Sequence, residues 1–143
     1  MATIKAYTDL KQSKKLAEIL PLESADMYYN NASIKGINYV DEYRVELMDY
    51  NTAQKVLSKY LINPMFGIIP CWSLAALISI IPQEIFDGEY IINITEGCDN
   101  RWVLTYDHFE NRNNSYYSLS TGADNLVDAC YEFILKLNEL NLL

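Results

Sequence analysis

A chain of 143 residues has the usual length of one domain, and because half of its residues are hydrophobic and 21% are charged, we do not expect an intrinsically disordered protein. Its formal net charge of −8 comes entirely from residues 61–143, which contain eleven Asp and Glu residues but three Lys and Arg residues. Nucleic acids and anionic membrane surfaces are bound through clustered basic side chains, so this charge argues against both as partners.

The N-terminal residues and the cysteines indicate the compartment. The segment "MATIKAYTDLKQSKK" at 1–15 has neither an apolar run nor a small-residue cleavage site, so we expect a cytoplasmic protein. Cys71, Cys98 and Cys130 show no CxxC spacing, which predicts reduced thiols rather than a disulfide framework.

Residues 1–64 are predicted to form a helix, two strands and a second helix. Asp9 with Gln12 three residues later is a capping-box pattern, and it opens a helix that should stop at Pro21. The elements expected after this helix are strands at 26–30 and 42–48 and a helix at 52–62.

The most hydrophobic stretch is "IIPCWSLAALISIIP" at 68–82. We expect a helix over 71–81, which at ~1.5 Å per residue spans about 16 Å and cannot cross the ~30 Å core of a bilayer. It is apolar nearly all round and should lie buried in the core. Pro82 should end it near Ile80. The apolar residues that fall on one stripe are Leu74, Leu77, Ile78 and Ile81.

Beyond this helix the apolar pattern changes from helical to alternating. Strands are expected at 89–95, 101–107 and 116–120, with a hairpin loop "EGCDN" at 96–100. The closing segment should be a helix capped by Asp124 or Asn125. Its apolar stripe is Leu126, Cys130, Phe133, Leu137 and Leu140.

The predicted fold class is therefore α+β in a single domain over 1–143. Residues 65–143 form an antiparallel three-stranded meander flanked by helices (αβββα), and residues 1–64 form an N-terminal helix–strand–strand–helix extension. The uncovered edge of such a meander allows a homodimer about a two-fold axis.

Two segments carry a resemblance to known proteins. "IPCWSLAALISIIP" at 69–82 and "DNLVDACYEFILKLNELNLL" at 124–143 resemble segments of a family of short uncharacterised proteins from gut-type anaerobic bacteria and their prophages. The order of elements in 72–140 is also similar to small phage αβββα sandwich domains. The resemblance covers about 35 of the 143 residues and supplies no catalytic or ligand residues.

The sequence contains candidate residues for two kinds of chemical site, a catalytic cysteine and a zinc site. Cys71 could act as a nucleophile with His108 as its base, although a free Cys beside an apolar helix is more often a buried hydrophobe. Cys71, Cys98, Cys130 and His108 have the ligand count of a zinc site but not the two-to-four-residue spacing. Nucleotide-loop and zincin motifs are absent as well, so we expect no metal and no cofactor.

Tyrosine is frequent, with 12 residues. Neighbours on a strand point to opposite faces, so one tyrosine of each adjacent pair should be exposed, where it favours protein contacts. The alternative is that these are the half-buried tyrosines of a small sheet. The candidate binding residues on this aromatic and acidic surface are Tyr28, Tyr29, Tyr116, Tyr117, Asp99 and Asp107.

The function that these features favour is a non-enzymatic protein-interaction module, an accessory protein of a phage or mobile element. One alternative is an acidic inhibitor that mimics nucleic acid at a host protein site. The other is a small hydrolase or transferase, for which a deep pocket lined by several of four residues would be the signature. Those residues are Cys71, Asp99, Asp107 and His108.

Overall fold

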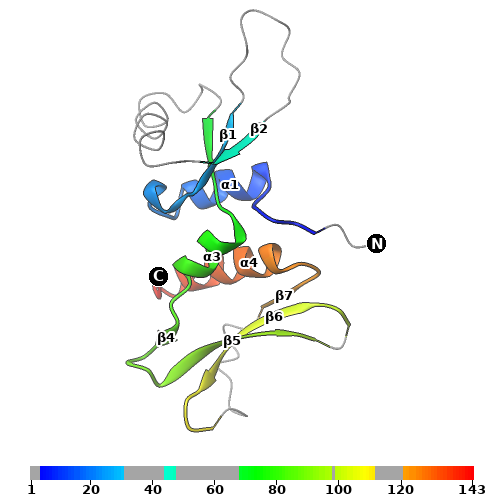
Figure 1. The fold of residues 1–143 in the computed structure, drawn as a ribbon. Coiled ribbons are helices and arrows are strands. Elements are labelled where there is room, and N and C mark those ends of the chain that lie inside the picture. The colour runs from blue at the N-terminus through cyan, green and yellow to red at the C-terminus, as the bar shows by residue number, and fades with distance from the viewer. Residues whose placement is uncertain (1–3, 31–43, 48–67, 98, 112–120) are drawn as a thin grey trace, which may run out of the picture. The chain divides into compact units, whose positions relative to one another are not determined.

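The structure is a computed structural model that describes residues 4–30, 44–47, 68–97, 99–111 and 121–143 (Figure 1). The chain divides into two compact units. The N-terminal unit comprises residues 7–76, and the C-terminal unit comprises residues 77–143 together with residues 1–6. The expected helix at 52–62 lies outside the described residues.

The N-terminal unit contains a three-stranded antiparallel sheet and one helix. The strands β1 (Met27–Asn30), β2 (Arg44–Leu47) and β3 (Ile68–Cys71) have the order β2-β1-β3. Helix α1 (Leu10–Ala17) packs against β3 and is followed by the 3-10 turn η1 (Leu22–Ser24). Both strands predicted at 26–30 and 42–48 are confirmed within these bounds.

Helix α1 begins at the predicted capping box. The Asp9 carboxylate accepts the Gln12 N–H at 2.8 Å, and the Asp9 N–H donates to the Gln12 side-chain oxygen at 3.1 Å. Two of the free N–H groups of the first turn are satisfied in this way. The regular helix ends at Ala17, four residues before the predicted stop at Pro21.

The hydrophobic stretch at 68–82 is not one buried helix, and the helix predicted over 71–81 is wrong in its start and in its burial. Residues 68–71 form strand β3 at the edge of the described sheet, where Pro70 is tolerated because an edge strand can lack one N–H. Helix α3 (Leu74–Ile80) then buries only Leu77, while Ile78 is 40% exposed. The end at Ile80 is confirmed. Trp72 is fully buried between the two elements, and its ring N–H donates to the Ser24 hydroxyl at 3.0 Å.

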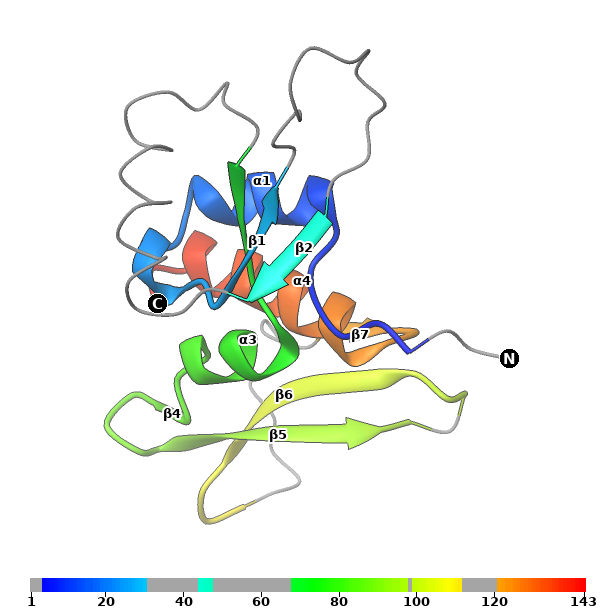
Figure 2. The same ribbon diagram turned by 45° about the horizontal axis from the view of Figure 1, so that its top comes forward.

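The C-terminal unit contains a four-stranded antiparallel sheet in the order β4-β5-β6-β7. Its strands are β4 (Glu84–Ile85), β5 (Tyr90–Glu96), β6 (Trp102–His108) and β7 (Thr121–Ala123), and α4 (Leu126–Glu139) follows. Figure 2 shows β5 and β6 side by side over most of their length. The mixed α+β class is confirmed, and the strands expected at 89–95 and 101–107 are present as β5 and β6. Strands β4 and β7 were not predicted. Beside β6 lies β7, and residues 116–120 lie outside the described part of the chain.

Helix α4 covers one face of this sheet. Its Phe133 ring lies 5.4 Å from the ring of Tyr106 on β6, and both side chains are fully buried. Of the two predicted caps, Asp124 and Asn125, the structure has Asn125, whose side chain accepts the Asp128 N–H at 2.8 Å. Among the described helices of both units, none is long and apolar enough to cross a membrane.

Candidate protein-interaction site along strand β5

Among the described strands, β5 is paired along its whole length only with β6. Toward β6 the ladder runs from Glu89, whose carbonyl accepts the Phe109 N–H at 2.8 Å, to Gly97, whose N–H donates to the Arg101 carbonyl at 2.6 Å. Backbone groups of an antiparallel strand alternate in direction. The odd-numbered residues of β5 therefore bond to β6, and the even-numbered residues face the opposite side.

The described residues cover that opposite side only at its start. Strand β4 pairs with Tyr90 and Ile91, and the Ile92 N–H donates to the Gln83 carbonyl at 2.9 Å. Beyond this point the N–H and C=O groups of Ile94 and Glu96 point out of the sheet, and no described strand pairs with them. We call the stretch Ile94–Glu96 the open edge. An edge of this kind is a template for a further strand.

An apolar hollow lies beside the open edge. It has a volume of about 280 Å³ and is bordered by the second half of α3 and by β5. Ile78 and Ile91 are 40% and 39% exposed, so the hollow opens to solvent. We call it the isoleucine hollow; its lining residues are Ile78, Ile81, Gln83, Ile91, Ile92 and Ile94. An exposed apolar concavity is typical of a surface that a partner covers.

The sheet face opposite α4 carries a polar cluster centred on Asp107. The Asp107 carboxylate accepts the Asn93 amide N–H at 2.8 Å and the Thr105 hydroxyl at 3.0 Å. Register explains the cluster, because Asn93 pairs with Thr105 across the strands and Asp107 lies two residues further along β6. A smaller hollow of about 160 Å³ adjoins it, lined by Ile91, Ile92, Asn93, Asp107, His108 and Phe109.

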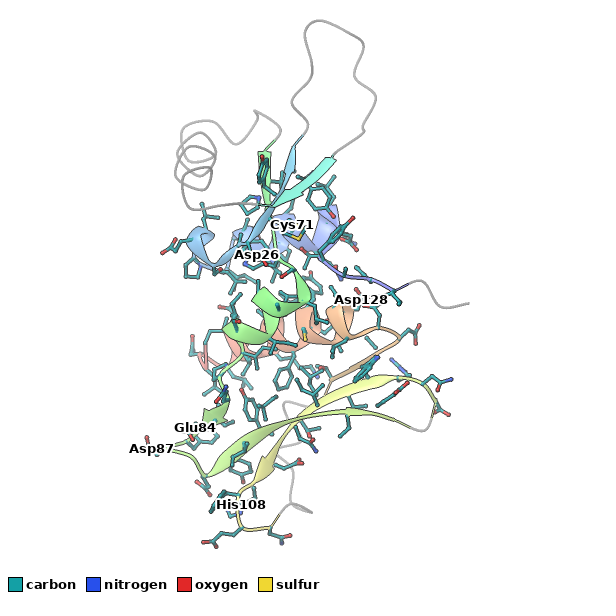
Figure 3. The ribbon with its side chains drawn as sticks, in the orientation of Figure 1. Asp26, Cys71, Glu84, Asp87, His108 and Asp128 are labelled. Carbon is teal, nitrogen blue, oxygen red and sulfur yellow. The ribbon has the colours of Figure 1, made fainter. Side chains whose placement is uncertain are left out.

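His108 is held by contacts within its own hairpin (Figure 3). Its Nδ1 accepts the backbone N–H groups of Glu110 and Asn111 at 3.2 and 3.4 Å, so in the neutral ring the proton is on Nε2. Nε2 lies 3.6 Å from Oε1 of Glu89. Asp107 precedes His108 on β6, so their side chains point to opposite faces and do not form an acid–base pair.

Cys71 lies in a buried polar cluster of the N-terminal unit. Its Sγ is 3.6 Å from the Thr8 hydroxyl and 3.5 Å from the Thr8 carbonyl oxygen. Burial is the main cause that raises the pKa of this fully buried thiol, so the nucleophilic thiolate is disfavoured. The described hydrogen-bond partners of Cys71 lie in the N-terminal unit, and those of His108 lie in the C-terminal unit. Cys71 and His108 therefore do not make the contact that a nucleophile and its base require.

The prediction that one tyrosine of the first pair is exposed is wrong, because Tyr28 and Tyr29 are each only 8% exposed. Both lie on β1, the central strand of its sheet, and the Tyr29 hydroxyl donates to the Thr8 carbonyl oxygen at 2.6 Å. Tyr116 and Tyr117 lie outside the described residues. Asp99 is exposed in the turn after β5. Of the predicted binding residues that the structure describes, Asp107 alone lines one of the two hollows beside β5.

The zinc site considered from the sequence needs its ligands close together, and the described residues do not provide such a group. Cys130 is fully buried in α4, where desolvation raises the pKa of its thiol to about 12. Within the described ranges no three His, Cys, Asp or Glu side chains are placed to hold a metal ion. Cys98 lies outside those ranges.

Comparisons with protein-family models, with curated proteins and with solved structures find no match for this chain. The site is therefore assigned from its geometry. Sequence reasoning predicted an uncovered edge of the meander but did not locate it at Ile94–Glu96, and it missed the isoleucine hollow. The available signal was Asp87-Gly88, which forms the tight turn between β4 and β5 with φ of 55° and 85°; such a turn marks a hairpin but does not reveal how long its first strand is.

Proposed function

We propose that this protein is a non-enzymatic protein-interaction module that binds its partner through the β5 surface. The observation that carries the proposal is the combination of an open strand edge with the adjoining isoleucine hollow. Main-chain groups supply hydrogen bonds to a partner, and the hollow supplies apolar area to bury. Ile78 and Ile91 are the most accessible parts of this apolar area.

The biological setting is part of the same proposal. The resemblance of 69–82 and 124–143 to proteins of gut-type anaerobes and their prophages, together with the order of elements that resembles phage αβββα domains, supports an accessory protein of a mobile element.

The two alternatives have less support. The acidic-inhibitor form rests on the charge of residues 61–143 and requires carboxylates spaced like phosphates, while Asp107 is hydrogen-bonded within the sheet. The enzyme form requires converging catalytic groups. The hollow that Asp107 and His108 line measures only about 160 Å³, and the two side chains leave β6 on opposite faces.

The test is capture of partners from a lysate of the host bacterium by the immobilised full-length protein. Ile91→Glu should abolish capture of any specific partner, because it places a carboxylate at the junction of both hollows. Ile4→Glu is the matched control, since Ile4 is 91% exposed and lines neither hollow. Equal capture by both variants, or no specific capture at all, would contradict the proposal.

A further inference from the structure

The open edge of β5 has room for a short added strand. Beyond the bond from Ile92 to Gln83, residues 93–96 of β5 are four residues, which at ~3.4 Å each is a length of about 14 Å. The outward groups of Ile94 and Glu96 offer two donors and two acceptors in this space. We infer that this edge binds an extended segment of a basic partner protein by β-strand addition. The inference rests on the proposed function and names the chemistry of the partner.

The side-chain contacts of such a strand follow from its geometry. Alternate side chains of the added strand point to the same sheet face as Ile92 and Ile94, and there they meet the isoleucine hollow. A hollow of about 280 Å³ accepts one or two aliphatic side chains. The segment should therefore alternate apolar residues with polar ones.

The charge of the edge selects among possible segments. Glu96 is exposed and lies at the far end of the uncovered stretch. It forms no ion pair with a described residue. Lysine or arginine in the added strand would compensate the Glu96 carboxylate, whereas an acidic segment would be repelled by it.

The same charge disfavours a second copy of the chain. Pairing two β5 edges about a two-fold axis would bring together two chains that each carry a formal charge of −8. It would also place both Glu96 carboxylates on one short ladder. The structure thus favours a basic partner segment over a homodimer.

The test uses two synthetic heptapeptides titrated against the full-length protein, with binding followed by fluorescence anisotropy and amide chemical shifts. One alternates lysine with valine, and the other alternates glutamate with valine. We expect the basic peptide to bind and the acidic one not to bind. The amide protons of Ile94 and Glu96 should become protected from exchange. Raising the salt concentration should weaken binding several-fold, because the ion pairs are exposed.

Two variants separate strand addition from simple charge attraction. Ile94→Pro removes an N–H that points away from β6, so the β5–β6 ladder keeps its hydrogen bonds while the added strand loses one. Ile94→Val keeps this N–H and is the matched control. We expect roughly tenfold weaker binding for Ile94→Pro and less than a threefold change for Ile94→Val.

Peptide variants also separate strand addition from simple charge attraction, without a change to the protein. Methylation of the backbone nitrogens at one alternate set of valine or lysine positions should abolish binding, while methylation of the other set should not. Equal binding of both methylated peptides, equal binding of the acidic peptide, or a dimer in light scattering that Ile94→Pro dissociates would overturn the inference. If the basic peptide fails to bind while lysate capture still depends on Ile91, only the strand-addition inference fails.

Discussion

Ser73 donates two hydrogen bonds to the carboxylate of Asp26, which Figure 3 labels in the N-terminal unit. The Ser73 N–H lies 2.8 Å from Oδ1, and the Ser73 hydroxyl binds Oδ2. The same hydroxyl oxygen accepts the Ala76 N–H at 3.2 Å. Ser73 therefore caps the start of α3, and a residue 47 positions earlier in the chain fixes the cap.

Removing this cap should destabilise the protein. Ser73→Ala loses the hydrogen bonds of the hydroxyl with Asp26 and Ala76 and keeps only the backbone N–H bond to Asp26, so we expect the free energy of unfolding to fall by about 1–2 kcal/mol. Urea denaturation followed by circular dichroism measures the change. Glu23→Gln, at an exposed position of η1, is the control and should lie within about 0.5 kcal/mol of wild type. A Ser73→Ala value in that same range would show that the cap contributes nothing.

The buried thiol of Cys130 should make stability depend on pH in the alkaline range. Its pKa is raised from 9.0 to about 12 in the folded protein. Between these two values the unfolded chain loses the proton and the folded chain keeps it, so stability is full below about pH 9 and falls as the pH rises.

The expected contribution of Cys130 to this fall is about 1 kcal/mol per pH unit. Cys130→Ala removes the group and should make the decline between pH 9 and 10.5 shallower by that amount. The measurement is the free energy of unfolding of both proteins across this range. Parallel curves would mean that the thiol titrates alike in both states. A constant offset between them is expected, because a fully buried side chain is shortened.

An ion pair fixes the N-terminal segment to α4. Lys5 Nζ lies 2.6 Å from Asp128 Oδ1, with side chains 23% and 34% exposed. Lys15 and Glu18 form a longer and more exposed pair at 3.2 Å, with side chains 52% and 68% exposed. We expect Lys5→Met to lower the free energy of unfolding by about 0.5–1 kcal/mol and Lys15→Met by less than about 0.5 kcal/mol.

The salt dependence tests whether the difference in cost between Lys5→Met and Lys15→Met is electrostatic. At ~1 M salt, where charges are screened within about 3 Å, the cost of Lys5→Met should shrink toward that of Lys15→Met. Chemical denaturation with urea at low and high salt measures both variants. A cost for Lys5→Met that is independent of salt would instead assign it to the packing of the lysine stem.

The β4–β5 turn depends on a glycine with positive φ. Gly88 has φ of 85°, and a Cβ there would lie 3.4 Å from Oε2 of Glu84. Gly88→Ala should cost about 1–2 kcal/mol because an L-residue is strained in this region. The matched control is Gly122→Ala on β7, whose φ is outside the left-handed region and whose nearest contact would be at 3.6 Å. Thermal unfolding compares the two, and an equal effect of both substitutions would contradict the role of the turn.

Local signals were enough to predict several elements. The capping box at Asp9 and Gln12, the alternation in β5 and β6, and the cap and apolar stripe of α4 are all confirmed. Each lies within one turn or one strand, so residues close in sequence determine it. The failure at 68–71 has the opposite cause, because these residues pair with β1, about 40 positions earlier. The prediction that Leu140 belongs to the apolar stripe of α4 is wrong, because Leu140 lies one residue past α4 and is 42% exposed.

The amino-acid sequence by itself determined the α+β class, the acidic charge of the C-terminal residues and the positions of most described helices and strands. Only the tertiary structure decided which surfaces remain accessible. It buried Tyr28 and Tyr29 on a central strand, and it ended β4 after two residues so that Ile94 and Glu96 face outward. The physical reason is that strand pairing and burial depend on contacts between distant segments, which periodicity within one segment does not encode.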